Sequence, residues 1–223
     1  MWVFLSHTLS PSSPSYGGGE SIKIEKVKEI SMGDSSNSSR WSLPNHIGTH
    51  VDAPYHFSQG GQTIERYSPE DWHFTSPRLI EYPMGPSELI TKEKLVPLLA
   101  DGEPTDCVLV RTGFESRRGD EVYWRENPGF DPATARWLRT AFPRLKIIGI
   151  DVISVSPWQD RTKGREAHRH FLGEGYPTAP VRLIEDMKLS PITAKLREVW
   201  VLPLRVSGSD GAPCTVVARI DEE

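Results

Sequence analysis

Three histidines and one aspartate lie within the eleven residues from His46 to His56. In an extended segment the side chains alternate between two faces, so residues two apart share a face. One face then carries every potential metal ligand of the segment: His46, His50, Asp52 and His56. A helix would instead pair His46 with His50, but Gly48 weakens a helix here and Pro54 would break it. The pattern therefore favours a strand or loop with a row of ligands along one edge.

The ligand types restrict the choice of metal. Two imidazoles and one carboxylate suit zinc with an open fourth position, as in catalytic zinc sites. Manganese or ferrous iron also fits such a ligand set. Cys107 and Cys214 are far apart and neither belongs to a C-x-x-C pair, which argues against a closed, cysteine-rich zinc site. A hydrogen-bond network without a metal is the alternative interpretation of the segment.

The segment from His46 to His56 reads H-x-G-T-H-x-D-x-P-x-H, and it resembles the signature of the metal-dependent cyclase family. That family includes bacterial kynurenine formamidase and isatin hydrolase. Further stretches resemble the family in the same order along the chain: residues 6–11, 110–113, 127–138, 148–155, 203–206 and 210–213. The resemblance thus covers essentially the whole chain, and it is specific for fold and metal chemistry rather than for a substrate.

A second cluster involves His168 and Glu185. Taken alone, His168 and His170 indicate an exposed polar helix face, and Glu185 indicates a charge in an apolar run. The resemblance implies instead that His168 and Glu185 bind a second metal ion, with Asp52 bridging the two. Two neighbouring ions can share the activation of one hydroxide. His170 has no counterpart in the family pattern.

Two stretches depart from the family pattern. Residues 176–180 lengthen the connection between His168 and Glu185, and Tyr16 is followed by three glycines where many members carry a Pro-Gly-Asp turn. Glycine permits a flexible loop near the site. These departures affect the expectation for the substrate more than the expectation for the metal.

The expected activity is hydrolysis of a small-molecule amide, formamide or lactam. A metal ion with an open position lowers the pKa of bound water and polarises a carbonyl. The resemblance implies that His56 is the acid/base, and histidine titrates near neutral pH as that role requires. The alternatives are a cyclase or dehydratase of a biosynthetic pathway, which would use the same metal, and a metal-binding protein without catalysis. The expected cofactor is one or two zinc ions, with manganese possible.

Length and composition indicate one enzyme domain over residues 1–223. A net charge of −4 with interspersed signs provides no basic surface for nucleic acid or an anionic membrane. The N-terminal segment lacks the pattern of a signal peptide, and no apolar run reaches membrane-spanning length. We therefore expect a cytoplasmic protein that acts on a small molecule.

Trp2, Phe4 and three central tryptophans (Trp72, Trp124 and Trp137) offer apolar surface, and with the resemblance they predict a homodimer or homotetramer.

Strand-like and helix-like segments alternate along the chain, which predicts an α/β fold. Strands are expected at 2–7, 21–30, 78–82, 107–111, 146–150 and 200–204, and helices at 91–100 and 132–141, with Pro97 either kinking the first helix or ending it early. Asp131 followed by Pro132 is a strong helix start. The resemblance implies a single domain of the swivelling β/β/α type, with a mixed sheet and flanking helices.

Overall fold

The structure is a computed structural model that describes residues 1–222. In this range nine strands form one mixed sheet, ordered β5-β12-β13-β4-β11-β10-β8-β6, with β1 also paired to β13. These strands are β1 (Trp2–Phe4), β4 (His50–Asp52), β5 (His73–Phe74), β6 (Pro77–Glu81), β8 (Cys107–Arg111), β10 (Ile147–Ile150), β11 (Arg182–Glu185), β12 (Leu196–Pro203) and β13 (Gly211–Ile220). The helices are α1 (Lys92–Leu95), α2 (Val122–Arg125), α3 (Pro132–Ala141) and α4 (Arg161–Leu172). The predicted α/β class, with a mixed sheet and flanking helices, is confirmed.

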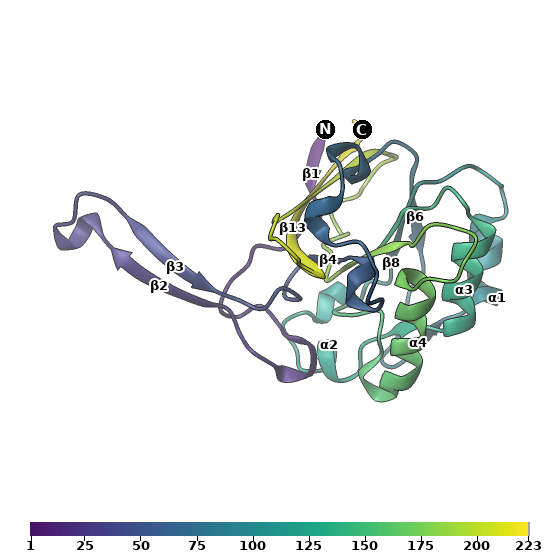
Figure 1. The fold of residues 1–223 in the computed structure, drawn as a ribbon, viewed down its shortest axis with the longest axis horizontal. Coiled ribbons are helices and arrows are strands. Elements are labelled where there is room, and N and C mark those ends of the chain that lie inside the picture. The colour runs from purple at the N-terminus through teal and green to yellow at the C-terminus, as the bar shows by residue number, and fades with distance from the viewer. Residues whose placement is uncertain (223) are drawn as a thin grey trace.

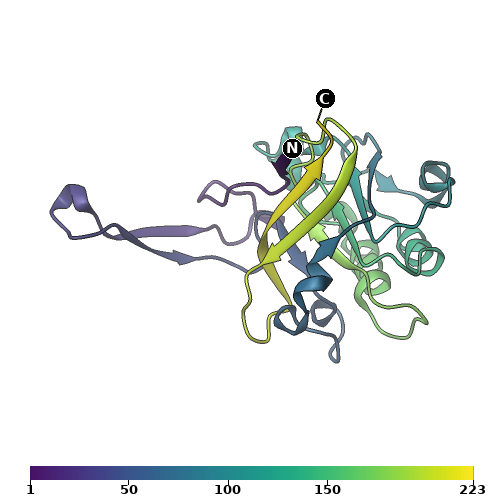
Figure 2. The same cartoon turned by 90° about the horizontal axis from the view of Figure 1, so that it is seen from above.

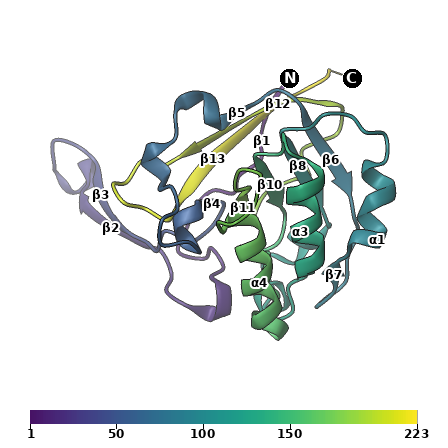
Figure 3. The ribbon, with the colours of Figure 1, turned by 45° about the vertical axis from the view of Figure 1, so that its right-hand side comes forward.

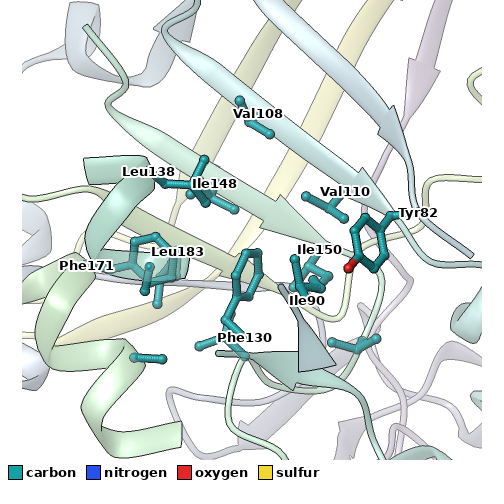
Figure 4. Close-up of a cluster of buried hydrophobic side chains, with 14 of the residues drawn as sticks. Tyr82, Ile90, Val108, Val110, Phe130, Leu138, Ile148, Ile150, Phe171 and Leu183 are labelled. Carbon is teal, nitrogen blue, oxygen red and sulfur yellow. The ribbon is translucent and has the colours of Figure 1, made fainter. Parts of the chain in front are cut away.

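Four parallel strands, β6, β8, β10 and β11, form one half of the sheet. Helices α3 and α4 cover one face of this half (Figure 3). Side chains of β8 alternate between two cores: Val108 and Val110 point to the helices, whereas Cys107 and Leu109 point to the opposite face. Both faces are therefore buried, as parallel strands require. Figure 4 shows the helix-side core, which includes Ile148 and Leu183. The rings of Phe130 and Phe171 pack edge to face in this core.

The other half of the sheet is antiparallel. The long strands β12 and β13 cross the front of the molecule in Figure 2 and enclose the second core, which includes Phe74, Val199, Val201 and Val216. Strand β4 joins the halves, because it pairs with β13 on one side and with β11 on the other. The short ligand-bearing strand therefore lies at the centre of the sheet.

Local sequence explains both predicted helices. Helix α3 begins as expected, since the Asp131 side chain accepts a hydrogen bond from the Ala133 N–H at 2.9 Å and Pro132 occupies the first turn. The expected helix over 91–100 is divided: α1 ends at Leu95, and the 3₁₀ helix Val96–Leu99 contains Pro97. Proline removes one helical hydrogen bond and clashes with the preceding turn, which accounts for the change.

A β-hairpin projects far from the body of the molecule (Figures 1 and 2). It consists of β2 (Lys23–Lys28) and β3 (Ser38–Ser42), which pair only with each other among the strands of residues 1–222. The second small sheet pairs β7 (Leu89–Ile90) with β9 (Gly129–Phe130). Exposed apolar side chains on the projecting hairpin and its tip are Ile24, Val27, Ile30, Met32 and Trp41. A two-stranded hairpin is marginally stable alone, so this arm needs support from outside its own strands.

The apolar surface lies elsewhere than the sequence predicts. Trp2 and Phe4 are exposed, as expected, but Trp72 is buried, and Trp124 and Trp137 pack against the helix-side core. The expectation of free surface is therefore wrong for Trp72, whereas Trp124 and Trp137 are only partly buried. None of the helices in residues 1–222 combines the length and apolar character that crossing a bilayer requires. Cys107 and Cys214 are both free thiols.

Candidate metal centre

Three segments that are distant in sequence meet at the middle of the sheet. Strand β4 supplies His50 and Asp52, while Val51 between them points into the second core. Strand β11 lies antiparallel to β4 with Glu185 opposite His50. Helix α4, which Figure 3 shows beside β11, supplies His168. The sheet register and one helix therefore place the predicted residues of both clusters in one site.

The ligand segment is not one continuous strand. Only His50–Asp52 is extended; His46 lies in a bend before it, and His56 lies in a 3₁₀ helix, Pro54–His56, after it. Gly48 has φ +62, and a Cβ there would come 2.2 Å from the Leu9 side chain. Pro54 starts the 3₁₀ helix. The prediction of one straight row is corrected: Gly48 and Pro54 bend both ends of the segment so that four side chains face one centre.

Thr49 fixes the bend. Its hydroxyl donates to the backbone carbonyl of Asp186 and accepts from the His7 backbone N–H at 2.9 Å. Both partners lie outside the cluster of His and carboxylate side chains. Thr49 therefore ties the ligand segment to the residues that follow β1 and β11 rather than contacting a ligand.

Two imidazoles and two carboxylates form the buried inner cluster, and each of the four residues is at most 4% exposed. His50 Nε2 lies 3.5 Å from Asp52 Oδ1 and 3.4 Å from Glu185 Oε2. His168 Nε2 lies 3.6 Å from Asp52 Oδ2 and 3.4 Å from Glu185 Oε1. His168, expected from its own neighbourhood to lie on an exposed helix face, is instead buried at the centre.

Backbone carbonyls orient both imidazoles of the inner cluster. His50 Nδ1 lies 2.8 Å from the Gly48 carbonyl oxygen, and His168 Nδ1 lies 2.9 Å from that of Gly164. Because a carbonyl can only accept, each Nδ1 carries the proton and each Nε2 faces the carboxylates. Glu185 Oε1 is held by the Val155 N–H at 2.7 Å and the Ser154 hydroxyl at 3.0 Å. Such supporting hydrogen bonds are typical of metal ligands.

This donor set fits a divalent cation. Two imidazole nitrogens and two carboxylates can each supply one ligand atom, which matches zinc or manganese chemistry. Ligand atoms of His50, Asp52 and Glu185 lie within 4.8 Å of one another, as do those of His46, Asp52 and His56. The structure thus groups the donors differently from the sequence expectation, which joined His46 and His50 to Asp52 in the first site. Asp52 belongs to both groups, as a bridging residue would.

An outer group lies beside the inner cluster. His46 Nδ1 lies 2.8 Å from Asp52 Oδ1, and its Nε2 lies 3.0 Å from Asp210 Oδ2. His56 Nδ1 lies 2.7 Å from the same Asp210 oxygen. Asp210 therefore orients His56, and no other hydrogen bond to the His56 ring is present within residues 1–222. The second ring nitrogen, Nε2, is left available in the site.

Asp210 is the residue that sequence reasoning missed as part of the site. It belongs to the stretch D-G-A-P at 210–213, which contributes to the family resemblance. It follows β12 and immediately precedes β13, so its proximity to His56 depends on the sheet rather than on sequence spacing. Its place at the start of a family-like stretch was the one signal that pointed to it.

The electrostatics reflect opposite charges held close together. Burial lowers the pKa of His168, but Asp52 and Glu185 outweigh burial and raise this pKa to about 10. Burial likewise lowers the pKa of His46, and Asp52 and Asp210 raise it to about 10. For Glu185, burial raises the pKa, but the neighbouring imidazoles lower it to about 2. Without a metal, the cluster is therefore held together by protonated histidines between carboxylates.

The site opens into a pocket of about 290 Å³. Its wall is partly apolar, with Ile47, Phe57 and Ile153, and the Phe57 ring stacks on His168 at 4.6 Å between ring centroids. This volume is at the small end of ligand pockets. The site therefore combines metal ligands, an oriented imidazole and space for one small molecule.

His170 lies away from the inner cluster. Its Nδ1 contacts the hydroxyl of Tyr176, which belongs to the longer connection over 176–180. The Arg139 guanidinium lies 4.2 Å from the centre of the Tyr176 ring and donates to the Thr178 carbonyl. The extra imidazole thus anchors the inserted loop instead of adding a ligand.

Comparison with known proteins shows which family the chain resembles. A family model described as "Putative cyclase" matches residues 3–157, which include the segment from His46 to His56. Kynurenine formamidase from Erythrobacter litoralis (strain HTCC2594) is 28% identical over 216 residues, covering 96% of this chain and 92% of that protein. Kynurenine formamidase from Maricaulis maris (strain MCS10) is also 28% identical, covering 98% and 97%.

Solved structures share the fold. Isatin hydrolase A from Labrenzia aggregata, bound to benzyl benzoate, superposes with a TM-score of 0.85 at 22% identity, covering 100% of this chain and 94% of that chain. A predicted metal-dependent hydrolase from Bacillus stearothermophilus gives a TM-score of 0.76 at 22% identity, with 98% and 97% covered. The first of these superpositions covers the whole chain, and with it the elements that carry His168, Glu185 and Asp210.

Proposed function

The chain belongs to the putative cyclase family, and from this membership we propose that it is a metal-dependent hydrolase of a small-molecule amide, formamide or lactam. The observation that carries the proposal is that four buried potential metal ligands border one pocket together with His56, whose ring Asp210 orients. Similarity to kynurenine formamidases and to isatin hydrolase fits the same chemistry.

The metal would be held by residues of the inner cluster, His50, Asp52, His168 and Glu185, with His46 beside them. When bound, zinc or manganese supplies a Lewis acid that polarises a carbonyl and lowers the pKa of water. Asp52, with one oxygen toward His50 and the other toward His168, suits a shared ligand if two ions bind.

His56 is the proposed proton carrier. Asp210 accepts a hydrogen bond from Nδ1–H of His56, which leaves the Nε2 lone pair facing the pocket as a base. From there His56 takes a proton from the attacking water and returns it to the leaving nitrogen. The His56–Asp210 pair also argues against a metal-binding protein without catalysis, because a structural site needs no oriented base. A cyclase or dehydratase would use the same residues and remains the second candidate.

The test is hydrolysis by zinc- or manganese-loaded protein of N-formylkynurenine, isatin and a simple lactone, measured beside chelator-stripped protein. Metal-dependent release of formate from the formamide, or ring opening of isatin, is the expected result. The matched control is His56→Ala, which should bind metal without turnover. Fully metal-loaded protein that hydrolyses none of these substrates would overturn the proposal and favour the cyclase or dehydratase alternative.

A further inference from the structure

Helix α4 presents two arginines and a proposed metal ligand on one face. Arg161, Arg165 and His168 follow the spacing i, i+4, i+7, which places side chains on one stripe of a helix. All three line the catalytic pocket. Since a helix rises 1.5 Å per residue, Arg165 and Arg161 lie about 5 and 10 Å from His168 along the axis. The pocket therefore has a metal end and an arginine end.

The two arginines are unpaired, in contrast to their neighbours on α4. Lys163 lies 3.4 Å from Asp160, and Glu166 lies 3.6 Å from His170. Neither Arg161 nor Arg165 has a carboxylate within 4.0 Å anywhere in residues 1–222. Both are exposed at the pocket mouth. Arg161 also lies over the Trp158 ring, 5.0 Å from its centre, which restricts where its guanidinium can point.

Tyr16 contributes a third donor to the same pocket from the N-terminal loop. Its hydroxyl is buried and has no hydrogen-bond partner within residues 1–222. Burial, with the nearby Glu185 charge, raises the pKa of Tyr16 to about 12, so the hydroxyl stays protonated as a donor. The Tyr16 ring meets Trp158 edge to face at 5.1 Å. A buried hydroxyl without a partner is costly and indicates a missing acceptor.

The loop that carries Tyr16 is fitted to this place. Gly17 has φ +70, and a Cβ at this residue would lie 2.4 Å from the Trp158 ring. Only glycine permits so close an approach with this backbone conformation. The glycine run that departs from the family pattern thus brings Tyr16 against Trp158 at the arginine end of the pocket.

We propose that Arg161, Arg165 and Tyr16 form an anion-binding subsite, and that the substrate carries a carboxylate about 5–10 Å from its reacting carbonyl. The inference rests on the proposed hydrolase function and specifies its substrate class. Two guanidinium groups supply donors only, and the neutral Tyr16 hydroxyl can donate one more hydrogen bond, which suits a carboxylate. The apolar wall at Phe57 and Ile153 and the volume of about 290 Å³ suit one aromatic ring between the carboxylate and the amide.

Binding of a matched acid and its neutral analogue tests the subsite. In zinc-loaded protein, 4-formamidobenzoate and 4-aminobenzoate should bind at least about tenfold more tightly than formanilide and aniline, measured by calorimetry. Arg165→Gln and Arg161→Gln should each remove about tenfold of this preference. Tyr16→Phe should weaken the acids alone. The zinc content should stay unchanged in all three variants.

Arg169→Gln is the matched control, because Arg169 is exposed on the same helix but does not line the pocket. Equal affinity for acid and neutral analogue in the wild-type protein overturns the inference. An equal loss of acid preference in Arg169→Gln also overturns the inference, because it would show a general effect of charge. Full acid affinity in both Arg161→Gln and Arg165→Gln overturns it as well, because the carboxylate would then lie at the metal.

Binding and turnover separate this inference from the proposed function. Arginine-dependent acid binding without hydrolysis of any formamide would support the subsite and contradict the hydrolase. Hydrolysis of formanilide and 4-formamidobenzoate with equal kcat/KM, together with equal binding, would support the hydrolase and contradict the subsite.

Discussion

Glu185→Gln tests the inner cluster most directly, because the structure determines how the new side chain must lie. The Val155 N–H and the Ser154 hydroxyl both donate to Glu185 Oε1, at 2.7 and 3.0 Å. A glutamine therefore keeps its oxygen at this position and turns its amide nitrogen toward the cluster. That nitrogen has no lone pair to offer a metal. The substitution thus removes one ligand and one negative charge with almost no change in shape.

The expected magnitude follows from the burial of the site. Asp52 and Glu185 together supply two negative charges, which a single divalent ion neutralises, and both are at most 4% exposed. Removing one partner from a buried charge pair costs about 3–5 kcal/mol. Metal affinity should therefore fall by roughly two to four orders of magnitude. In a protein that binds two ions, the stoichiometry should fall while the other site stays partly loaded.

Metal content after dialysis and competition with a chromophoric chelator measure this loss. Glu166→Gln is the matched control, since it removes one charge from an exposed position on α4. Circular dichroism of the metal-free proteins checks that both variants fold. If Glu185→Gln binds metal with the affinity and stoichiometry of the wild-type protein, the assignment of Glu185 as a ligand is refuted.

The remaining predictions concern the metal, the base, pH and assembly. His50→Ala should lose most bound metal, because His50 Nε2 faces both inner carboxylates; unchanged metal by elemental analysis would contradict its role. His56→Ala should retain metal and lose about 10²–10⁴-fold in kcat, and full activity on an identified substrate would end its assignment as the base. His46 and His168 have pKa values of about 10 in the folded, metal-free protein and about 6.5 when unfolded. Their stabilisation is therefore complete below about pH 6.5 and is lost as pH rises through 10, so the melting temperature of chelator-treated protein should fall between pH 7 and 10; a constant value would contradict this. A homodimer or homotetramer is expected, with the apolar side chains of the projecting hairpin supported by another copy; light scattering at micromolar concentration that gives a monomer mass would rule it out.

The potential ligand residues and the chemistry expected of them could be predicted from the sequence. Four potential ligands at close spacing predicted a metal segment, and the core strand Cys107–Arg111 and the helix start at Asp131 followed from local pattern. These features depend on residues close together in the chain, where periodicity and capping act. The resemblance extended the prediction to His168 and Glu185, whose own neighbourhoods gave no indication of burial.

Tertiary structure alone decided how the donors are grouped. His50 faces Glu185 because β4 and β11 pair antiparallel in one register, and a shift of one residue between the strands would place the two side chains on opposite faces. Asp210 reaches His56 across 154 residues of sequence. Arg161, Arg165 and Tyr16 meet at one pocket because helix α4 and the N-terminal loop pack around Trp158. Sequence specifies which side chains can do chemistry, whereas the long-range pairing of strands and helices sets the distances and burial that let them act together.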